Sequence, residues 1–443
     1  MIRHMFKKQH LFDLLVIIAV GFLPFTQALT LDLKFPFKIY EFLLVIAIGW
    51  GAVTLDPKLL HINWKIVGPA VALWMVAALS LAVAPSSSAI SAAYAVRFGP
   101  TGDGLAKLVY FLFVLLSFSI ILNVSKDRWH DVANAWLAGA IFAAVYSLVL
   151  CSMSFADVHP SLLPGLERHQ TFSYAGHKLI RSGTFEEGNF AGLFFILSVG
   201  LAMQTGRRFL AVLFTLAVLA TFSTISITAL FILWLVYGYY YLVNGRLRLG
   251  VKIATISLAV FSFFIFLRSD YANEVFRRKL VTDQVISRNV RLEAARMALN
   301  AVRSKPILGI GLSQFGYHFP EFQPKEERKA ILTNEPRNKD LNSPPASPNV
   351  PVERILLSKR IINNVYLEIL AETGVLGFLC FLAFLVVIVR MTWKNDAVFL
   401  KATFIGLLLV FNAYPSFSVL FIWAFFALMV SYPVWKDHPY KSG

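Results

Sequence analysis

The stretch that decides the fold runs from Arg181 to Met203 and reads RSGTFEEGNFAGLFFILSVGLAM. One arginine and two adjacent carboxylates, Glu186 and Glu187, lead directly into an apolar run long enough for a membrane helix. Charges at the mouth of a membrane helix are costly unless they have a partner. We therefore interpret the apolar part as a membrane span and ask what Arg181 binds.

The rest of the chain is equally apolar. Of its 443 residues, 57% are hydrophobic and 15% are charged, and the mean hydropathy is +0.66. Repeated apolar runs of this kind predict an all-α polytopic integral membrane protein. The net charge of +16 then belongs to the loops that set orientation, and no nucleic-acid partner is expected. Both cysteines lie inside apolar runs, so neither a disulfide nor a metal site is expected.

Twelve apolar runs predict about twelve transmembrane helices in a single membrane domain, residues 1–443. Basic residues precede the first run, which continues through Pro24 without a small-x-small cleavage site, so we expect an uncleaved first helix. The runs cover roughly residues 11–30, 37–55, 64–84, 105–123, 131–152, 187–203, 207–224, 226–243, 249–267, 363–390, 398–415 and 417–435.

The short loops alternate in charge along the chain. Every second one is basic, and these loops are 56–65, 125–130, 205–208, 244–252 and 390–394. By the positive-inside rule, both termini are then cytoplasmic. Three external segments remain, which are 85–104, about 153–186, and 268–362.

The longest external segment, 268–362, lies between the ninth and tenth spans and carries 17 Lys and Arg against 10 Asp and Glu. Its stretch 287–303 predicts an amphipathic helix. The apolar stripe expected on that helix consists of Leu292, Ala295, Leu299 and Val302. Pro306 and the glycines after it are expected to end the helix and open a tight turn.

Arginines are the first candidate site residues. Arg181 and Arg291 lie on the same external side in this topology, and a planar guanidinium suits phosphate oxygens. A pair of them near the bilayer would suit a lipid-linked diphosphate; alternatively, Arg181 snorkels at a helix end and Arg291 belongs to a solvated face. Arg97 in the first external segment, and Arg288 on the same helix face as Arg291, are further expected substrate contacts.

Carboxylates and one histidine are the acid–base candidates. Glu186 and Glu187 either neutralise Arg181, provide a base, or stabilise the positive end of the following helix. His318 and Glu321 are expected in an exposed loop, as proton-transfer groups or as ordinary solvated side chains.

Charged residues also occur inside the spans. Glu368 and Glu372 are four residues apart on one helix face, where a carboxylate is either functional or paired, for example with a loop arginine. Glu41 and Lys107 either pair internally or line a cavity.

The sequence contains no Gly-x-x-x-x-Gly-Lys phosphate loop, no His-rich metal spacing and no Ser-His-Asp set that the topology supports. Chemistry that depends on a soluble nucleotide is therefore not indicated, and neither a cofactor nor a metal is expected. A donor that carries its own activation, such as a lipid diphosphate, fits better.

Three stretches resemble the bacterial O-antigen ligase and O-antigen polymerase superfamily. RSGTFEEGNFAG (181–192) is similar to the family's Arg-x-x-Gly-Thr-Phe…Asn-x-x-Gly entry to a helix. RLEAARMALNAVRSKPILGIGLSQF (291–315) is similar to its arginine-led helix and Pro-x-x-Gly-x-Gly-x-x-x-Phe turn. NNVYLEILAETGVLGF (363–378) is similar to its His-Asn-x-Tyr-Leu…Glu-x-Gly-x-x-Gly. Their order and the long external loop agree over most of the chain.

The resemblance implies a C-type glycosyltransferase fold and a metal-independent, inverting transfer at the periplasmic face of the bacterial inner membrane. The donor would be a glycan on undecaprenyl diphosphate, which Arg181 and Arg291 would bind and stabilise as the leaving group. Other positions expected to contact the substrate are Asn189, Asn363 and Tyr366. The candidate bases are His318, Glu187 and Glu368.

One position departs from the family pattern. Ligases are expected to carry a histidine where this chain has Asn363, and asparagine cannot serve as a general base. The departure favours a polymerase, which joins one lipid-linked repeat unit to another, over a ligase, which transfers polysaccharide to lipid A–core. The expected partners are an undecaprenyl-diphosphate-linked oligosaccharide, the lipid bilayer and a chain-length regulator protein.

Two alternatives come from other classes. A transporter of lipid-linked glycans would suit about twelve spans and intramembrane glutamates, but no paired half-repeats with broken helices are visible. A purely structural membrane partner would not need the arginine-led helix.

Overall fold

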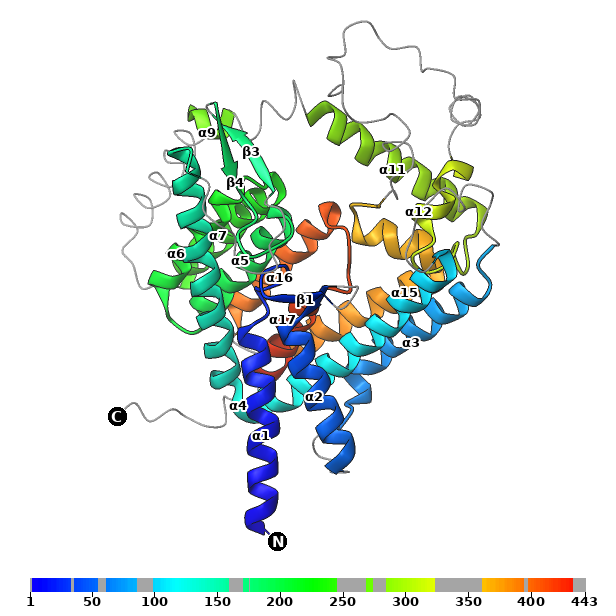
Figure 1. Ribbon diagram of the computed structural model, residues 1–443, viewed down its shortest axis with the longest axis horizontal. Coiled ribbons are helices and arrows are strands. Elements are labelled where there is room, and N and C mark those ends of the chain that lie inside the picture. The colour runs from blue at the N-terminus through cyan, green and yellow to red at the C-terminus, as the bar shows by residue number, and fades with distance from the viewer. Residues whose placement is uncertain are drawn as a thin grey trace, which may run out of the picture.

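The computed structural model describes residues 2–32, 36–54, 61–85, 99–158, 170–174, 176–244, 268–273, 284–322, 361–393 and 397–432. Within these ranges the chain is a bundle of apolar helices with two short hairpins (Figure 1). The bundle helices are α1 (Ile2–Gly21), α2 (Ile39–Thr54), α3 (Trp64–Ala82), α4 (Gly99–Phe155), α5 (Gly188–Gln204), α6 (Arg208–Ala220), α7 (Thr224–Asn244), α15 (Val365–Trp393), α16 (Val398–Val410) and α17 (Leu420–Ser431).

The remaining elements lie in the connections. One hairpin pairs β1 (Thr30–Asp32) with β2 (Pro36–Lys38), and the other pairs β3 (Thr171–Tyr174) with β4 (His177–Ile180). The helices in the connections are the long α11 (Gln284–Ser304) and the short α9 (Asp270–Ala272), α12 (Phe315–His318), η3 (Phe319–Phe322) and η4 (Phe411–Ala413).

Three of the helices, α3, α4 and α15, are long and apolar enough to cross a membrane, and the other bundle helices contain shorter apolar stretches. Helices occur at eleven of the twelve predicted spans when α4 is counted twice. The remaining span, 249–267, lies outside the described residues. The structure thus confirms a mostly helical, multi-pass membrane protein, and the number of spans stays a prediction.

Two of the basic stretches between spans lie at the same end of the bundle. At one end Arg128 of α4 lies 3.8 Å from Asp13 of α1, and Arg207 Nη2 donates to Asn134 Oδ1 at 2.6 Å. The two basic stretches that were predicted as loops, 125–130 and 205–208, therefore lie at the same end of the bundle. The N-terminus is also on this side of the molecule in Figure 1, whereas β3, β4 and α11 lie on the opposite side. Which side faces the cytoplasm stays a prediction.

Two helices form the centre of the bundle. Every residue of α17, and every residue of α5 from Ala191 to Met203, is buried. A helix that is apolar all round must be enclosed by others. Accordingly, α5 packs against α4, α6 and α16, and α17 packs against α4 and α15. This enclosure fixes the position of the polar start of α5.

Two of the predicted span boundaries are wrong. The first span was expected to continue through Pro24, but α1 ends at Gly21, because proline has no N–H to extend the helix. A loop was expected at 125–130, but α4 runs through it with one non-helical residue, Arg128 (φ −130°, ψ 41°). A kink at one residue is sufficient to reverse the direction of the chain there.

Helix α11 confirms the predicted helix, but its predicted apolar stripe is wrong. Leu292 and Leu299 are 52% and 43% exposed. The buried stripe consists instead of Ala294, Met297, Ala298 and Ala301. Small side chains allow α11 to pack closely against α15. The predicted stripe contains the largest apolar residues of the helix, whereas close packing against α15 buries mainly its alanines.

Helix α15 is broken at Gly374 (φ 68°, ψ −171°), and the turn after α11 inserts at the break. The backbone N–H of Gly311 donates to the Glu372 carbonyl at 3.0 Å, and that of Val375 donates to the Pro306 carbonyl at 2.8 Å. The predicted tight turn is thus confirmed, and it replaces hydrogen bonds that the broken helix cannot make. The external segment is held to the membrane bundle at this point.

Candidate functional site

The connection between β4 and α5 holds Arg181 against the start of α5. Its guanidinium lies over Gly188, where an added Cβ atom would be 2.4 Å from Arg181 Nε. Arg181 Nη2 donates to Asn189 Oδ1 at 3.4 Å. Its Nε is buried and has no hydrogen-bond partner among the described residues. A buried donor without a partner indicates a place for an acceptor that the protein does not supply.

Two polar residues that the sequence analysis missed hold this arrangement in place. Gln170 Oε1 accepts a hydrogen bond from the Gly188 N–H at 2.7 Å, and the Gln170 carbonyl accepts one from the Arg181 N–H at 3.0 Å. Ser223 Oγ donates to Asn189 Oδ1 at 2.8 Å. Asn189 is therefore oriented by both Arg181 and Ser223. An ordinary glutamine and serine in distant segments give no sequence signal for this role.

Arg291 lies close enough to Arg181 to affect its pKa. Burial lowers the pKa of Arg181 to about 10, Glu187 opposes this shift, and Arg291 adds to it. Burial also raises the pKa of Glu187, and Glu186 acts in the same direction, while both arginines lower it. Arg181 and Glu187 thus lie at the start of α5, and the exposed Arg291 adds positive charge in the same region; that the two arginines act as a pair stays a prediction. Two cations held together would be stabilised by an anion.

An aromatic wall stands beside Arg181. Phe172 and Phe222 stack with their ring centroids 5.0 Å apart, and Tyr271 packs against Phe222 at 5.4 Å. Burial raises the pKa of Tyr271, whereas Arg181 lowers it. An apolar wall excludes water, and charge–charge attraction is stronger where water is excluded. The site therefore favours binding of an anion at Arg181.

Gly188→Ala is expected to reduce transfer activity about 100-fold without unfolding the protein. The added methyl group would force the guanidinium away from Asn189, and misplacement of a positioned group by about 1 Å costs roughly that factor. Activity and the thermal unfolding temperature should be measured on the same purified variant. Gly238→Ala is the control, because an added Cβ atom there has nothing within 4 Å. Normal activity of Gly188→Ala would contradict the proposed position of Arg181.

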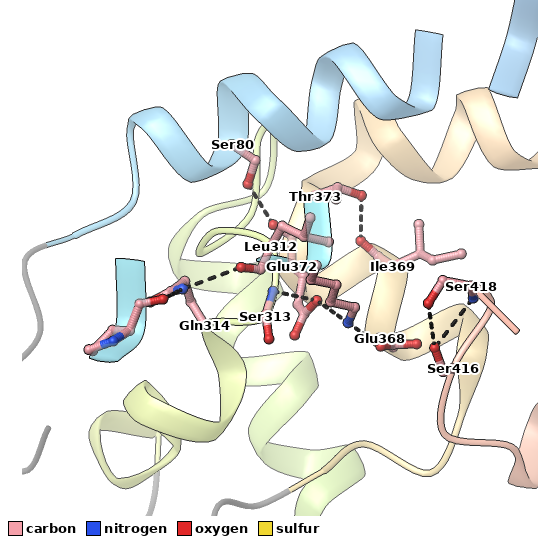
Figure 2. Close-up of polar contacts among 12 residues, drawn as sticks. Ser80, Leu312, Ser313, Gln314, Glu368, Ile369, Glu372, Thr373, Ser416 and Ser418 are labelled. Carbon is pink, nitrogen blue, oxygen red and sulfur yellow. Dashed lines mark hydrogen bonds and ion pairs between the residues drawn. The ribbon is translucent and has the colours of Figure 1, made fainter. Parts of the chain in front are cut away.

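A second charged cluster joins α4 to the broken part of α15 (Figure 2). Lys107 Nζ lies 2.7 Å from Glu368 Oε1 and 3.2 Å from Glu372 Oε2. The Ser313 N–H donates to Glu372 Oε2 at 2.8 Å, and Ser80 Oγ donates to the Glu372 carbonyl at 2.6 Å. The partner of both glutamates is thus an intramembrane lysine and not a loop arginine. Of the two alternatives expected for Lys107, internal pairing and lining a cavity, the structure shows internal pairing.

Lys107→Met is expected to lower the free energy of unfolding by about 3 kcal/mol or more, because two buried carboxylates lose their cation. Thermal unfolding in detergent measures the loss. Adding Glu372→Gln should restore part of it, and Lys65→Met at the exposed start of α3 is the matched control. An unchanged unfolding temperature would mean that the cluster contributes no stability.

His318 is not in an exposed loop, so that prediction is wrong. Its side chain is fully buried, and its Nδ1 lies 2.9 Å from Glu321 Oε1. The surrounding cluster includes Met297, Phe315 and Phe319, because α12 packs its aromatic residues under α11. A histidine enclosed in this way has a structural place between the two helices.

The other predicted site residues lie at the start of α15 or outside the described residues. Tyr366 donates from its hydroxyl to the Leu408 carbonyl at 2.8 Å and so ties α15 to α16. Asn363 is half-buried just before Asn364, whose Oδ1 accepts a hydrogen bond from the Leu367 N–H. The candidates not described are Arg97 and the side chain of Arg288. In the described ranges, no three His, Cys, Asp or Glu side chains gather as a metal site requires.

Comparison with known proteins gives one result. Residues 209–382 match the model of a family described as O-antigen ligase. This segment includes α6, α7, α11, α12 and the first half of α15, and therefore Arg291, Asn363 and Glu368. Arg181 precedes the matched segment, so the family match does not include it. No curated protein matches the chain. The match supports the resemblance at the two later sequence stretches, and over residues 209–382 the chain is similar to the O-antigen ligase family.

Proposed function

We propose that this protein is a polysaccharide polymerase of the bacterial inner membrane. It transfers a glycan from undecaprenyl diphosphate to a sugar hydroxyl of another lipid-linked repeat unit, on the periplasmic side. The observation that carries the proposal is Arg181 beside the start of α5, with its Nε buried and unpartnered among the described residues, and Arg291 adds positive charge in this region. A lipid diphosphate supplies both the charge and the acceptor oxygens that this arrangement lacks.

In the proposed reaction, the acceptor hydroxyl attacks the anomeric carbon of the donor. A new C–O bond forms, the bond from this carbon to the diphosphate oxygen breaks, and the configuration inverts. Arg181 and Arg291 stabilise the negative charge that develops on the leaving diphosphate, a type of stabilisation that is often the largest catalytic contribution. The hydroxyl proton passes to a base. The protein's groups carry out every step, and no metal is required.

Glu187 is the base that the geometry favours. Of the other candidates, Glu368 is paired with Lys107, and His318 is enclosed beneath α11. Glu187 precedes the first residue of α5, and its side chain does not cap the helix. It lies within the electrostatic influence of both arginines. In our proposal, Glu187 takes the proton on the side of the anomeric carbon from which the acceptor hydroxyl attacks, opposite the leaving diphosphate.

The transfer rate is expected to fall at acidic pH, because Glu187 must be ionised to accept a proton. Burial and Glu186 raise its pKa, so the fall should occur above the usual range of a glutamate. Glu187→Gln should be slower by about 10² to 10⁴ at a pH where the wild-type carboxylate is ionised, and the difference should shrink at acidic pH. Glu321→Gln is the control, since that residue belongs to the external segment but pairs with His318. A Glu187→Gln variant with the wild-type pH profile would exclude Glu187 as the base.

A ligase is the second candidate, because the matching family is described by that activity. A single residue favours the polymerase over the ligase. Position 363, where a ligase is expected to carry histidine, is asparagine, and its neighbour Asn364 is used as the helix cap of α15. No replacement histidine lies at the start of this helix.

A deletion strain tests the proposed function. Its outer glycolipids and its pool of lipid-linked glycans are analysed together, with the wild-type gene restored as a control. A polymerase predicts outer glycolipids that carry a single repeat and no ladder. Long polymer that accumulates on undecaprenyl diphosphate without reaching lipid A would identify a ligase. Single repeat units that accumulate on the cytoplasmic side would identify a transporter.

A further inference from the structure

A cavity of about 180 Å³ lies on a different side of the first turn of α5 from Arg181. Its lining includes Thr26, Lys38, Tyr40, Tyr110, Glu186 and Phe190. Asn189 faces Arg181 and Ser223, whereas the next residue, Phe190, lines the cavity. The cavity and the arginine site therefore share one helical turn. We infer that this cavity is the subsite for the acceptor sugar, an inference that rests on the proposed transfer to a sugar hydroxyl.

The cavity is connected directly to the loop that carries Arg181. Thr184 Oγ1 donates to the Pro24 carbonyl at 2.7 Å, and the Gln27 N–H donates to the Thr184 carbonyl at 3.2 Å. The segment that contains Thr26 is thus fixed to the Arg181 loop. Glu186 lines the cavity, and the adjacent Glu187 interacts with Arg181. A hydroxyl bound here lies next to the proposed base.

The polar groups of the cavity are held in place by a buried carboxylate. Glu41 is 5% exposed and accepts a hydrogen bond from the Tyr110 hydroxyl at 3.1 Å. The Lys38 ammonium lies 3.4 Å from the same carboxylate, and the Lys38 N–H donates to it at 3.1 Å. Ser416 and Ser418, also in the lining, are joined through their hydroxyls at 2.9 Å. Preorganised groups of this kind are typical of a binding site.

One wall group has no partner. Thr26 Oγ1 is buried and makes no hydrogen bond to any described residue. Other hydroxyls of the described residues also lack partners, but Thr26 Oγ1 belongs to a residue that lines the cavity, so we take its hydroxyl as a hydrogen-bonding group for the sugar. The substitution Thr26→Val removes this hydroxyl and nearly preserves the shape of the side chain. Its effect on sugar binding can therefore be measured without an activity assay.

The chemistry of the cavity selects a sugar and not a phosphate. Glu41 and Glu186 outnumber the single cation, Lys38, so the cavity repels an anion. Tyr40 and Tyr110 offer aromatic surface, and the hydroxyl and charged groups offer hydrogen bonds, the combination that a pyranose ring requires. The volume is below the ~300 Å³ at which drug-sized sites begin, so it suits one sugar ring and not a whole repeat unit.

The acceptor is favoured over the donor by the direction of attack. In an inverting transfer, the hydroxyl approaches the anomeric carbon from the side opposite the leaving diphosphate. The diphosphate is proposed to lie at Arg181, on one face of the first turn of α5. The cavity is lined by Phe190, about 100° around the same turn from Asn189, which bonds to Arg181, so the cavity borders a different face of this turn. An acceptor sugar in the cavity therefore approaches from a face of the turn that the diphosphate does not occupy.

Two binding measurements on the purified full-length protein in detergent test the inference. One uses undecaprenyl diphosphate, and the other uses the free oligosaccharide that mild acid releases from the strain's own lipid-linked repeat unit. Thr26→Val and Glu186→Gln should each weaken oligosaccharide binding about tenfold, the usual effect of losing a hydrogen bond in a binding site. Neither should change undecaprenyl diphosphate binding, and Thr26→Val should not lower the unfolding temperature. Lys401→Met, outside the cavity, is the matched control.

The outcomes separate the cavity from the proposed function. Oligosaccharide binding that is absent in the wild type, unchanged in both cavity variants, or displaced by undecaprenyl diphosphate would overturn the acceptor subsite. Oligosaccharide binding that is lost in the cavity variants and retained in Arg181→Ala would support it. If the cavity binds the oligosaccharide but the deletion strain keeps its polymer ladder, the polymerase is wrong and the sugar subsite stands.

Discussion

Arg181→Ala is expected to abolish polymer formation, with a loss of transfer rate of about 10² to 10³. Arg181 is the cation whose buried Nε has no partner among the described residues, so it has the most to offer a leaving diphosphate. Arg181→Lys should also be poor, because lysine offers a point charge in place of a planar fork. The rate is measured with purified protein and a lipid-linked repeat unit, together with the thermal unfolding temperature.

Two further variants complete this experiment. Arg291→Ala should reduce the rate similarly, since Arg291 lies close enough to shift the pKa of Arg181. Arg303→Ala is the matched control, because Arg303 is an exposed arginine in the last turn of the same helix, α11. A normal rate in Arg181→Ala, or an equal loss in Arg303→Ala, would remove the arginine pair from the mechanism.

Gly374→Ala is expected to have the largest effect on stability, a loss of about 3 kcal/mol or more in the free energy of unfolding. The backbone of Gly374 (φ 68°, ψ −171°) is accessible almost only to glycine. An added Cβ atom would also lie 2.2 Å from the Ile307 carbonyl oxygen, and a backbone atom cannot move aside cheaply. The turn after α11 would then leave the break in α15. The loss is measured by thermal or denaturant unfolding in detergent.

The control for this prediction is a glycine in a regular helix. Gly49 lies in α2 with nothing within 4 Å of an added Cβ atom, so Gly49→Ala should be neutral or slightly stabilising. The activity of Gly374→Ala should fall with its stability, because α11 carries Arg291 and this turn anchors α11. A Gly374→Ala protein as stable as Gly49→Ala would mean that the turn does not hold the external segment.

The positions of the helices were predictable because each buries a long apolar run. The internal details were not predictable, because they depend on contacts between distant segments. The buried stripe of α11 was wrong because packing against α15 favours Ala298 over Leu299. The loop predicted at 125–130 was wrong because a polar stretch is equally compatible with a kinked helix. Pro24 did carry the correct signal, but the apolar residues around it outweighed it.

The candidate site was predictable in part. Arg181, Glu187 and Asn189 lie within nine positions of the sequence, and the structure places Arg181 against Asn189 at the start of α5. Gln170 could not be predicted, because its amide reaches Gly188 across the hairpin β3–β4. The partner of Glu368 was also unpredictable. Lys107 is 261 residues away in the chain, and only the folded bundle brings the two together.

The most direct test of the central claim is reconstitution. Purified protein in liposomes is given a lipid-linked repeat unit in buffer that contains EDTA, and both the glycan length and the released undecaprenyl diphosphate are measured. Our account predicts a ladder of polymer, with one undecaprenyl diphosphate released for each linkage formed and neither product from Arg181→Ala. Repeat units that remain single and lipid-linked in the presence of folded wild-type protein would contradict it.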